Sequence, residues 1–361
     1  MKNLVKIFSI VLLSLCTSCN AQDYEVYAKF EGVRPANPAV AKDGTVYVTM
    51  HPLDGADVSL MKVSPEGKHT AYPNKKWASN PVKGIGTANA IGIQATEEDL
   101  LYVLDFGNAT NPARLVVWNL KNDALHRIYN IPSTVAHKTS FMQDFAIDTE
   151  RQMVYIADMT RSDLIGEQAP AIVIINLKTG ETKRVLENDP TFLPSNTGLP
   201  VDGKLLNVNG AQVNLGLNPI VISPDNKWLY YSTMTEGFVY RIKSETLADF
   251  SKSDEDLKKS IEKYGPKPAS DGMSIDGAGN VYITDVSANG VGVTTKDNYK
   301  LLFSSPKVSW MDGMAYGGDG YFYGIVNELH KAAPFNNGTE KGSGKYKIIK
   351  FKALAAGKIG R

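Results

Sequence analysis

The sequence predicts an all-β fold, a six-bladed β-propeller, and three observations support this prediction. A phrase of about a dozen residues recurs six times along the chain. Each copy has the pattern of two strands joined by a turn of Asp, Gly or Asn residues. The composition, with 17 tyrosines and 31 glycines beside many valines and isoleucines, favours β structure. We therefore expect residues 23–361 to form a single propeller domain.

Each of the six copies consists of an alternating apolar strand, a tight turn and a second strand rich in aromatic residues. They are PAVAKDGTVYVTM (38–50), AIGIQATEEDLLYVLD (90–105), FAIDTERQMVYIAD (145–158), PIVISPDNKWLYYST (219–233), MSIDGAGNVYITD (273–285) and MAYGGDGYFYGI (314–325). Matched positions in successive copies are 53, 54, 75, 53 and 41 residues apart. Most of these gaps leave room for the third and fourth strands that complete a blade.

Three segments fall outside the repeat. The strand YEVYAKF (24–30) precedes the first copy, and we expect it to complete the last blade and close the ring. The longest gap contains a segment at 187–216 rich in Gly, Pro and Asn, which predicts a long connection. Residues 245–263 predict a helical insertion in blade four with a loose apolar stripe. Both insertions either shape access to the central funnel or decorate the surface.

The first 22 residues have the pattern of an export signal. Lys2 and Lys6 precede an apolar run at 7–16 that is too short to span a bilayer. Cleavage before Cys19 would leave a cysteine that carries lipid, although Cys16 stands where lipoprotein signals usually have an aliphatic residue. We expect an exported protein, anchored by lipid at Cys19 to a bacterial membrane or cell surface. Cleavage after Ala21 would instead give a secreted or periplasmic protein.

The charge and the cysteine positions exclude several classes of function. Lys and Arg number 39 against 38 Asp and Glu, without a basic stripe, so nucleic acid is not an expected partner. Both cysteines lie in the signal segment, so the mature chain has neither disulfides nor thiol chemistry. The five histidines lack zinc spacing, although His51, at the end of a strand, could act as a base. We expect a small-molecule partner.

Polar side chains lie where the first strand of each blade begins, at one end of the central channel. They are Asn37, Asn89, Gln143 with Asp144, Asn218, Asp271 and Asp312. The second strands end on the same face, with Asp105, Asp158 and Asp285 at matched positions. We expect a polar funnel whose ligand-binding residues are Asn37, Asn89, Asp105, Asp158, Asp285 and Asp312.

Carboxylates and amides without histidine or cysteine are the ligands that a hard cation prefers. Calcium takes about six to eight oxygen ligands, and amide oxygens serve beside one or two carboxylates. The sequence therefore predicts a Ca²⁺ site, with metal ligands Asp271, Asn218, Gln143 and Asp144. Asp and Asn before a strand also cap turns with their side chains, and this alternative applies to each residue singly.

Five segments resemble the yellow and major royal jelly protein family. They are FMQDFAIDTERQMVYIAD, LLYVLDFGN, GLNPIVISPDNKWLYYSTM, KPASDGMSIDGAGNVYITD and WMDGMAYGGDGYFYGIVNE. Strand order, the long loop before blade four and the helical insertion also match, from about residue 25 to 352. The cysteines typical of the insect members are absent, so their disulfides are not implied here.

The chain is more distantly similar to the regucalcin and gluconolactonase propellers. There SDGMSID resembles the segment whose aspartate binds a divalent cation and acts as a base, which implies this catalytic role for Asp271. The same resemblance implies metal ligands at Asn218 and at Gln143 or Asp144. The first-blade glutamate ligand of those lactonases is missing, because PANPAV offers only Asn37.

Two classes of function remain open. The first is binding of a small ligand or amine in the central funnel, with or without a divalent cation, as the loss of the first-blade glutamate favours. The second is a Ca²⁺-dependent enzyme that hydrolyses a sugar-type lactone or tautomerises a quinone-like substrate. Asp271 together with Asn218 favours this alternative.

Overall fold

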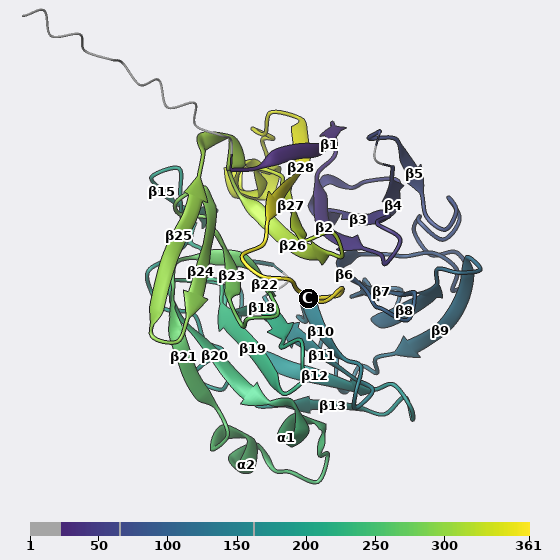
Figure 1. Cartoon of the computed structure of the whole chain (residues 1–361), viewed down its shortest axis with the longest axis vertical. Coiled ribbons are helices and arrows are strands. Elements are labelled where there is room, and N and C mark those ends of the chain that lie inside the picture. The colour runs from purple at the N-terminus through teal and green to yellow at the C-terminus, as the bar shows by residue number, and fades with distance from the viewer. Residues whose placement is uncertain (1–22, 65, 162) are drawn as a thin grey trace, which may run out of the picture.

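The computed structural model describes residues 23–64, 66–161 and 163–361 and has the predicted six-bladed architecture (Figure 1). Six antiparallel sheets of four strands each are arranged around a central axis, so the predicted fold class is confirmed. The predicted signal segment at 1–22, with Cys16 and Cys19, lies outside the described residues.

Blades one to five are built from consecutive strands, in order from the axis outwards. Blade one contains β2 (Pro35–Val40), β3 (Val46–Met50), β4 (Leu60–Val63) and β5 (His69–Ala71). Blade two contains β6 (Ala90–Ala95), β7 (Leu100–Asp105), β8 (Arg114–Asn119) and β9 (Ala124–Asn130). Blade three contains β10 (Met142–Asp148), β11 (Met153–Asp158), β12 (Ala171–Asn176) and β13 (Thr182–Val185). Blade four contains β18 (Leu217–Ile222), β19 (Trp228–Thr233), β20 (Gly237–Lys243) and β21 (Glu262–Lys267). Blade five contains β22 (Ser270–Ile275), β23 (Val281–Asp285), β24 (Gly290–Thr295) and β25 (Asn298–Ser304).

Blade six joins the two ends of the ring. It contains β26 (Met311–Gly317), β27 (Tyr321–Val326), β28 (Lys345–Lys352) and, as its outer strand, β1 (Glu25–Glu31). β1 pairs antiparallel with β28, with Phe30 opposite Tyr346. The chain therefore begins and ends the propeller in the same sheet.

Apolar side chains between neighbouring blades form the core. Between blades two and three, for example, Leu115 and Val117 pack with Phe145, Val154 and Ile156. Both faces of each inner strand are buried, so the strands have almost continuous apolar sequences instead of strict alternation. Each blade is consequently held by its two neighbours.

Every inner strand carries a β-bulge near its start. The register shifts lie between Pro35 and Pro38, Ala90 and Ile93, Met142 and Asp144, Leu217 and Ile220, Ser270 and Met273, and Met311 and Met314. A bulge leaves its extra residue without a ladder partner and turns its side chain to a new direction. In blade five, Thr284 of the second strand stabilises the bulge, because its Oγ1 accepts hydrogen bonds from the backbone amides of Asp271 and Gly272. The six bulges bring a ring of side chains to the axis.

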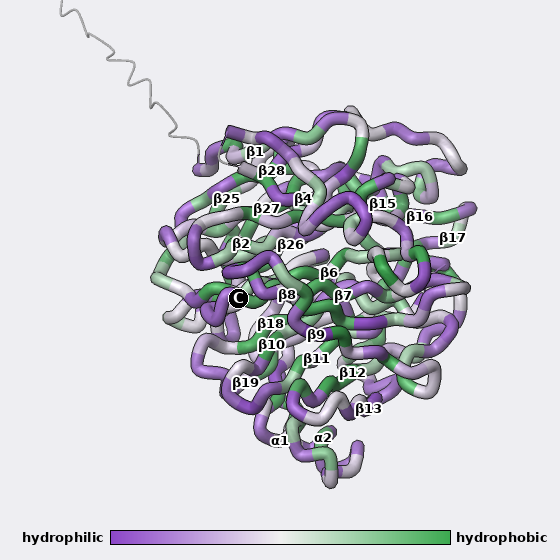
Figure 2. The backbone as a smooth tube through the Cα atoms, turned by 90° about the vertical axis from the view of Figure 1, so that its right-hand side faces the viewer, coloured by the Kyte–Doolittle hydropathy of each residue, from purple (hydrophilic) through white to green (hydrophobic). Residues whose placement is uncertain are grey.

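Two segments cover the opposite ends of the axis (Figure 2). The insertion before blade four forms two small hairpins on the face where the second strands end. Their strands are β14 (Pro200–Val201) with β15 (Lys204–Leu205), and β16 (Asn207–Val208) with β17 (Ala211–Gln212). Residues 353–361 cross the other face and reach the axis (Figure 1).

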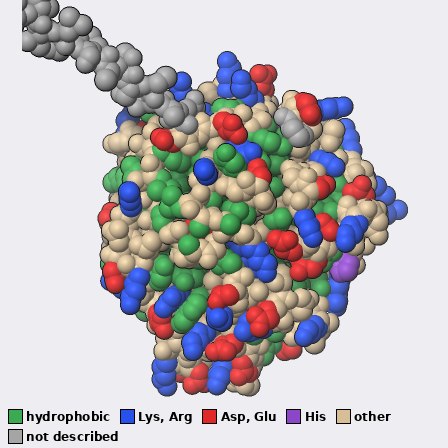
Figure 3. All heavy atoms as spheres, in the orientation of Figure 1, with side chains coloured by type: hydrophobic (Ala, Val, Ile, Leu, Met, Phe, Trp, Pro, Cys, Tyr) green, Lys and Arg blue, Asp and Glu red, His purple; other side chains and the backbone are tan. Residues whose placement is uncertain are grey.

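The segment at 353–361 closes the end of the channel that lies opposite the insertion. The Arg361 guanidinium donates to the backbone oxygen of Ile147 in blade three and to Oδ1 of Asn226 in blade four. The backbone amide of Tyr316 in blade six donates to the carbonyl of Arg361. Acidic and basic side chains are intermixed towards the edge of this face, so neither sign dominates it (Figure 3).

The insertion in blade four differs from the single helix predicted at 245–263. The structure has two helices of five residues each, α1 (Ser244–Ala248) and α2 (Asp254–Lys258), at the outer edge of the propeller (Figure 1). Asp249 interrupts the helix because its carboxylate accepts from the backbone amide and hydroxyl of Ser251. In the part of the chain that the structure describes, no helix is long and apolar enough to cross a membrane.

Candidate functional site

Asp271 is the centre of the group that the bulges bring together. Its side chain is buried, and Oδ1 accepts from Nδ2 of Asn218 at 2.8 Å. Oδ2 accepts from the indole Nε1 of Trp310, also at 2.8 Å. Burial raises the pKa of Asp271 to about 6, while these two hydrogen bonds and the charge of Lys267 oppose the rise. The carboxyl group can therefore gain or lose a proton near neutral pH.

Two more acids lie near Asp271 on the axis. Asp312 accepts a 2.7 Å hydrogen bond from Asn327, and its pKa is raised by burial and by the charges of Asp271 and Asp144. Burial also raises the pKa of Asp144 to about 7, although the amides of Phe145 and Ile220 oppose this. Like charges in a buried site cannot all ionise easily, so protonation of some of the three carboxyl groups, or an added cation, is favoured.

Lys267 belongs to the same site, and sequence reasoning missed it. Its buried ammonium group donates to the carbonyl of Thr235 at 2.9 Å and to the carbonyls of Thr233 and Met234. Burial lowers its pKa to about 7, against the charges of Asp285, Glu236 and Asp271. Lys267 thus fixes the loop after β19, and in its protonated form it places a positive charge beside the acids. No motif in the sequence marks it.

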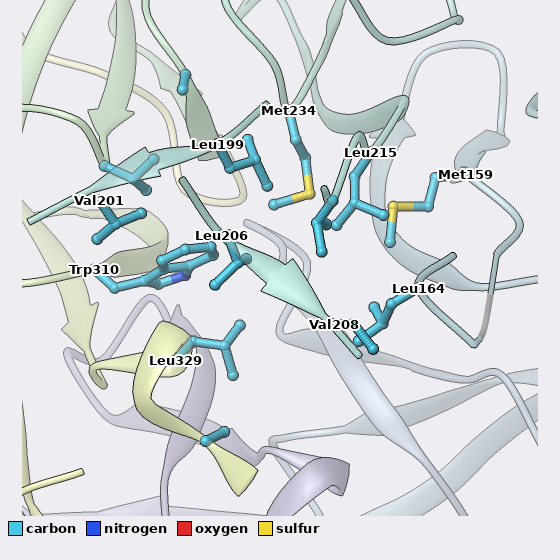
Figure 4. Packing of buried hydrophobic residues seen from close by; sticks show 14 of the residues in the cluster. Met159, Leu164, Leu199, Val201, Leu206, Val208, Leu215, Met234, Trp310 and Leu329 are labelled. Carbon is cyan, nitrogen blue, oxygen red and sulfur yellow. The ribbon is translucent and has the colours of Figure 1, made fainter. Parts of the chain in front are cut away.

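The mouth of the channel is apolar, in contrast to the predicted polar funnel. The rim side chains Phe141, Met159, Met234, Trp310 and Leu329 face the insertion. The insertion covers them with Leu199, Val201, Leu206, Val208 and Leu215 (Figure 4). The space that remains between them and Asp271 is only about 20 Å³, roughly the room of one water molecule. We call this space the chamber.

The structure places the other predicted ligand-binding acids away from the axis. Asp105 accepts from the amides of Ala88 and Asn89 and from the guanidinium of Arg114. Asp158 accepts from the amide of Phe141 and from Arg184, and Asp285 accepts from the hydroxyl of Tyr299. These carboxylates use their oxygens to hold turns and strands of their own blades, as the alternative of turn capping predicts.

Asn89 is also outside the group. The residue of blade two that is equivalent to Asp271 is Ile91, because the bulge in β6 follows the pair Ala90 and Asp105. The spacing of the repeat matches Ile93 to Ile275, but the bulges show that Ile93 is equivalent to Met273, two residues earlier. Asn89 instead donates to the carbonyl of Gly107.

The remaining predicted residues lie at the axis in different surroundings. Gln143 lines the chamber, where its amide contacts the sulfur of Met159. Asn37 and Asp144 line a second, partly open space of about 30 Å³ between the bulges and Arg361. His51 lines the chamber, but burial lowers its pKa to about 3 and its Nδ1 accepts from the amide of Leu53. It is therefore neutral at physiological pH.

The donor set offers only part of a metal site. Among the residues that the structure describes, no three His, Cys, Asp or Glu side chains come close enough together to hold an ion. The Asp271 carboxylate already accepts hydrogen bonds at both oxygens, from Asn218 and Trp310. Oδ1 of Asn218 is buried beside it without a hydrogen-bond partner in the described structure, so one amide oxygen is available to a cation.

The fold and the site define the class of protein: a six-bladed propeller with acids on its axis beneath an apolar, covered mouth. The sequence model of the family described as major royal jelly protein matches residues 88–352. The chain belongs to this family. A search of the curated proteins returns no match.

Solved structures share the architecture at low sequence identity. A luciferin-regenerating enzyme is 14% identical with a TM-score of 0.56, covering 92% of this chain and 97% of its own. The calcium-binding protein regucalcin from Agrobacterium tumefaciens is 12% identical with a TM-score of 0.53, covering 92% and 98%. A putative gluconolactonase is 11% identical with a TM-score of 0.57, covering 94% of each chain. At these identities the likeness concerns the fold alone.

Proposed function

We propose that this protein is an exported propeller that binds a small organic cation, an amine with an apolar body, in the chamber above Asp271. The observation that carries the proposal is a buried carboxylate directly beneath apolar walls. An ammonium group would compensate the charge that burial disfavours. The apolar body would pack against side chains such as Phe141 and Met234, which favours its transfer from water.

The proposal extends to location. A lipid at Cys19 would hold the binding domain at a bacterial membrane or cell surface, and cleavage after Ala21 would release it instead. Fractionation of cells that produce Cys19→Ala separates the two routes. If the lipid is attached, this variant leaves the membrane fraction; an unchanged distribution would contradict the anchor.

Calorimetry with 2-phenylethylamine, and with the neutral 2-phenylethanol as control, tests the binding proposal. We expect the amine to bind at pH 7.5 and the alcohol to bind at least tenfold more weakly, because only the amine carries a charge for Asp271. Asp271→Asn keeps the shape of the side chain and should reduce amine affinity by a similar factor. Asp43→Asn, in an exposed turn at the opposite end of the blades, is the matched control.

The pH dependence gives a second readout of the same experiment. An amine of this kind stays protonated up to about pH 9, so the titration of Asp271 governs binding in the acid range. Its pKa of about 6 means that affinity should fall roughly tenfold per pH unit below that value and level off above it. Equal affinity for amine and alcohol at every pH would sink the proposal.

A metal-dependent hydrolase of the lactonase type is the second candidate, and one observation favours it. The unpartnered Oδ1 of Asn218 lies beside Asp271, whose pKa near 6 suits a general base. Gln143 and Asp144 would be the remaining ligands of a Ca²⁺ ion, which would supply a Lewis acid for a lactone carbonyl. Metal analysis and δ-gluconolactone hydrolysis, measured for wild type and Asp271→Asn, test this candidate. Hydrolysis by a wild-type protein that contains no calcium, or the absence of both calcium and hydrolysis, would contradict it.

A further inference from the structure

The insertion over the chamber is a loop with a narrow neck. The amide of Leu217 donates to the carbonyl of Phe192 at 3.0 Å, and this bond brings the two ends of the segment together. Gly216 stands in the neck because a Cβ there would come within 2.4 Å of the same carbonyl. Residues 193–215, which we call the lid, therefore extend from one closed point over the mouth of the channel.

The carboxylate of Asp202 fastens the far end of the lid, whose apolar side chains also pack on the rim of the channel. Asp202 lies in the turn between β14 and β15, with a φ of 49°. It accepts from Nδ2 of Asn289 in blade five at 2.7 Å. It also accepts from Ser309 and lies 3.0 Å from Nε2 of His330, both in the loops beside blade six. Asp202 thus ties the lid to two blades on the side opposite its neck.

His330 connects this fastening to the axis. Its ring stacks on Trp310, with ring centroids 5.9 Å apart and an interplanar angle of 18°. The indole N–H of Trp310 in turn donates to Asp271. Trp310 has a φ of 50°, a left-handed conformation that is costly for a bulky side chain and needs support from its surroundings. A continuous series of contacts therefore runs from Asp202 through His330 and Trp310 to Asp271.

We propose that this series is an autoinhibitory latch: with the lid fastened, the Trp310 indole occupies Asp271 in place of the ligand. The inference rests on the proposed binding of an amine at Asp271 and adds its regulation. The fastened chamber has room for about one water, so an amine binds only after the indole leaves. The ligand then binds the open state alone, and its apparent affinity falls with the population of that state.

Reciprocal linkage makes the latch testable from both ends. A change that unfastens the lid must strengthen ligand binding, and the ligand must favour the open lid by the same factor. The lid carries one basic residue, the exposed Lys204, so tryptic cleavage after Lys204 reports on opening without any ligand. Mass spectrometry of the fragments distinguishes this cut from others, and Lys204→Gln abolishes it.

The first arm uses cleavage alone. Asp202→Asn removes the charge of the fastening at nearly constant shape, and we expect cleavage after Lys204 to become about three to ten times faster. His330→Ala should have a similar effect because it removes both the partner and the stack. Asp43→Asn is the control and should cleave at the wild-type rate. Unchanged cleavage in Asp202→Asn would overturn the latch, whatever the ligand does.

The second arm adds 2-phenylethylamine. In wild type the amine should accelerate cleavage, and Asp202→Asn should bind it three to ten times more tightly. Trp310→Phe keeps an aromatic ring but loses the N–H, and it should also bind the amine more tightly. Faster cleavage in Asp202→Asn without tighter binding would overturn the coupling through Trp310. Absence of amine binding in all variants would refute the proposed function. The cleavage rates would still test whether Asp202 and His330 hold the lid closed.

Discussion

At the residue scale, burial controls the charge of the acids on the axis. Asp144 has a pKa of about 7, so the folded protein keeps this proton to a higher pH than the unfolded chain does. Between about pH 4 and pH 7 the unfolded chain binds fewer protons, and stability therefore falls as the pH rises. The neighbouring acids act in the same direction. The site thus reduces the stability of the free protein at neutral pH.

Asp144→Asn tests this cost. The amide cannot ionise, so the variant should have a higher Tm than wild type at pH 8, by roughly 2–4 °C, and the same Tm at pH 4. Calorimetry across this pH range measures both values. A variant that is destabilised equally at both pH values would show that Asp144 acts through its hydrogen bonds and not through its charge.

The residues that the repeat marks could be predicted, and those that other segments contribute could not. Asp271, Asn218 and Asp312 stand at one phase of the repeat, which is why their meeting at the axis could be deduced. The same logic failed at Asn89, because the phase of the bulge in blade two is not visible in the sequence. Trp310 and His330 belong to loops outside the repeat. Only the fold places Trp310 beside Asp271 and His330 beside Trp310.

At the scale of elements, second-strand acids hold the blades together. Asp158 accepts from two backbone amides and from Arg184, so removing its carboxylate would leave a nearly buried guanidinium without its partner. A broken pair of this kind costs about 3–5 kcal/mol. The insertion shows the reverse case: its Pro- and Gly-rich sequence predicts a connection, but its two-residue strands are too short for periodicity to reveal that they cover the mouth.

Asp158→Ala should lower the free energy of unfolding by about 3 kcal/mol in urea titrations, for the reason just given. Glu262→Ala removes the exposed partner of Arg241 and should change it by less than about 1 kcal/mol. Amine affinity of folded Asp158→Asn should equal that of wild type. If Asp158→Asn is stable but no longer binds the amine, Asp158 contributes to ligand binding and not only to the stability of its blade.

At the scale of the whole molecule, the repeat dictates the ring and β1 closes it. Six hairpins at regular spacing could be arranged in only a few ways, and burial of both faces of each sheet favours a circle of blades. The Phe30 side chain of β1 is buried among residues of blades one and six. The closing strand is therefore part of the core as well as of the sheet, and the six blades should unfold together.

Phe30→Ala checks this cooperativity. Loss of a buried phenylalanine costs about 3–5 kcal/mol, and Val26→Ala, at an exposed position of the same strand, should cost much less. Urea unfolding followed by tryptophan fluorescence and by circular dichroism should shift as one coincident transition. Two separated transitions would mean that blade six detaches before the rest of the ring.

Residues 353–361 close the end of the channel opposite the insertion, and this closure limits which ligands could bind on the axis. A ligand can therefore reach the axis, and leave it, only through the mouth of the channel beneath the lid. A long polymer could insert its terminus but could never thread through, and cutting or reading along its length would be impossible here. Closure of this end therefore favours, for any ligand that binds on the axis, a compact molecule or the tip of a longer one.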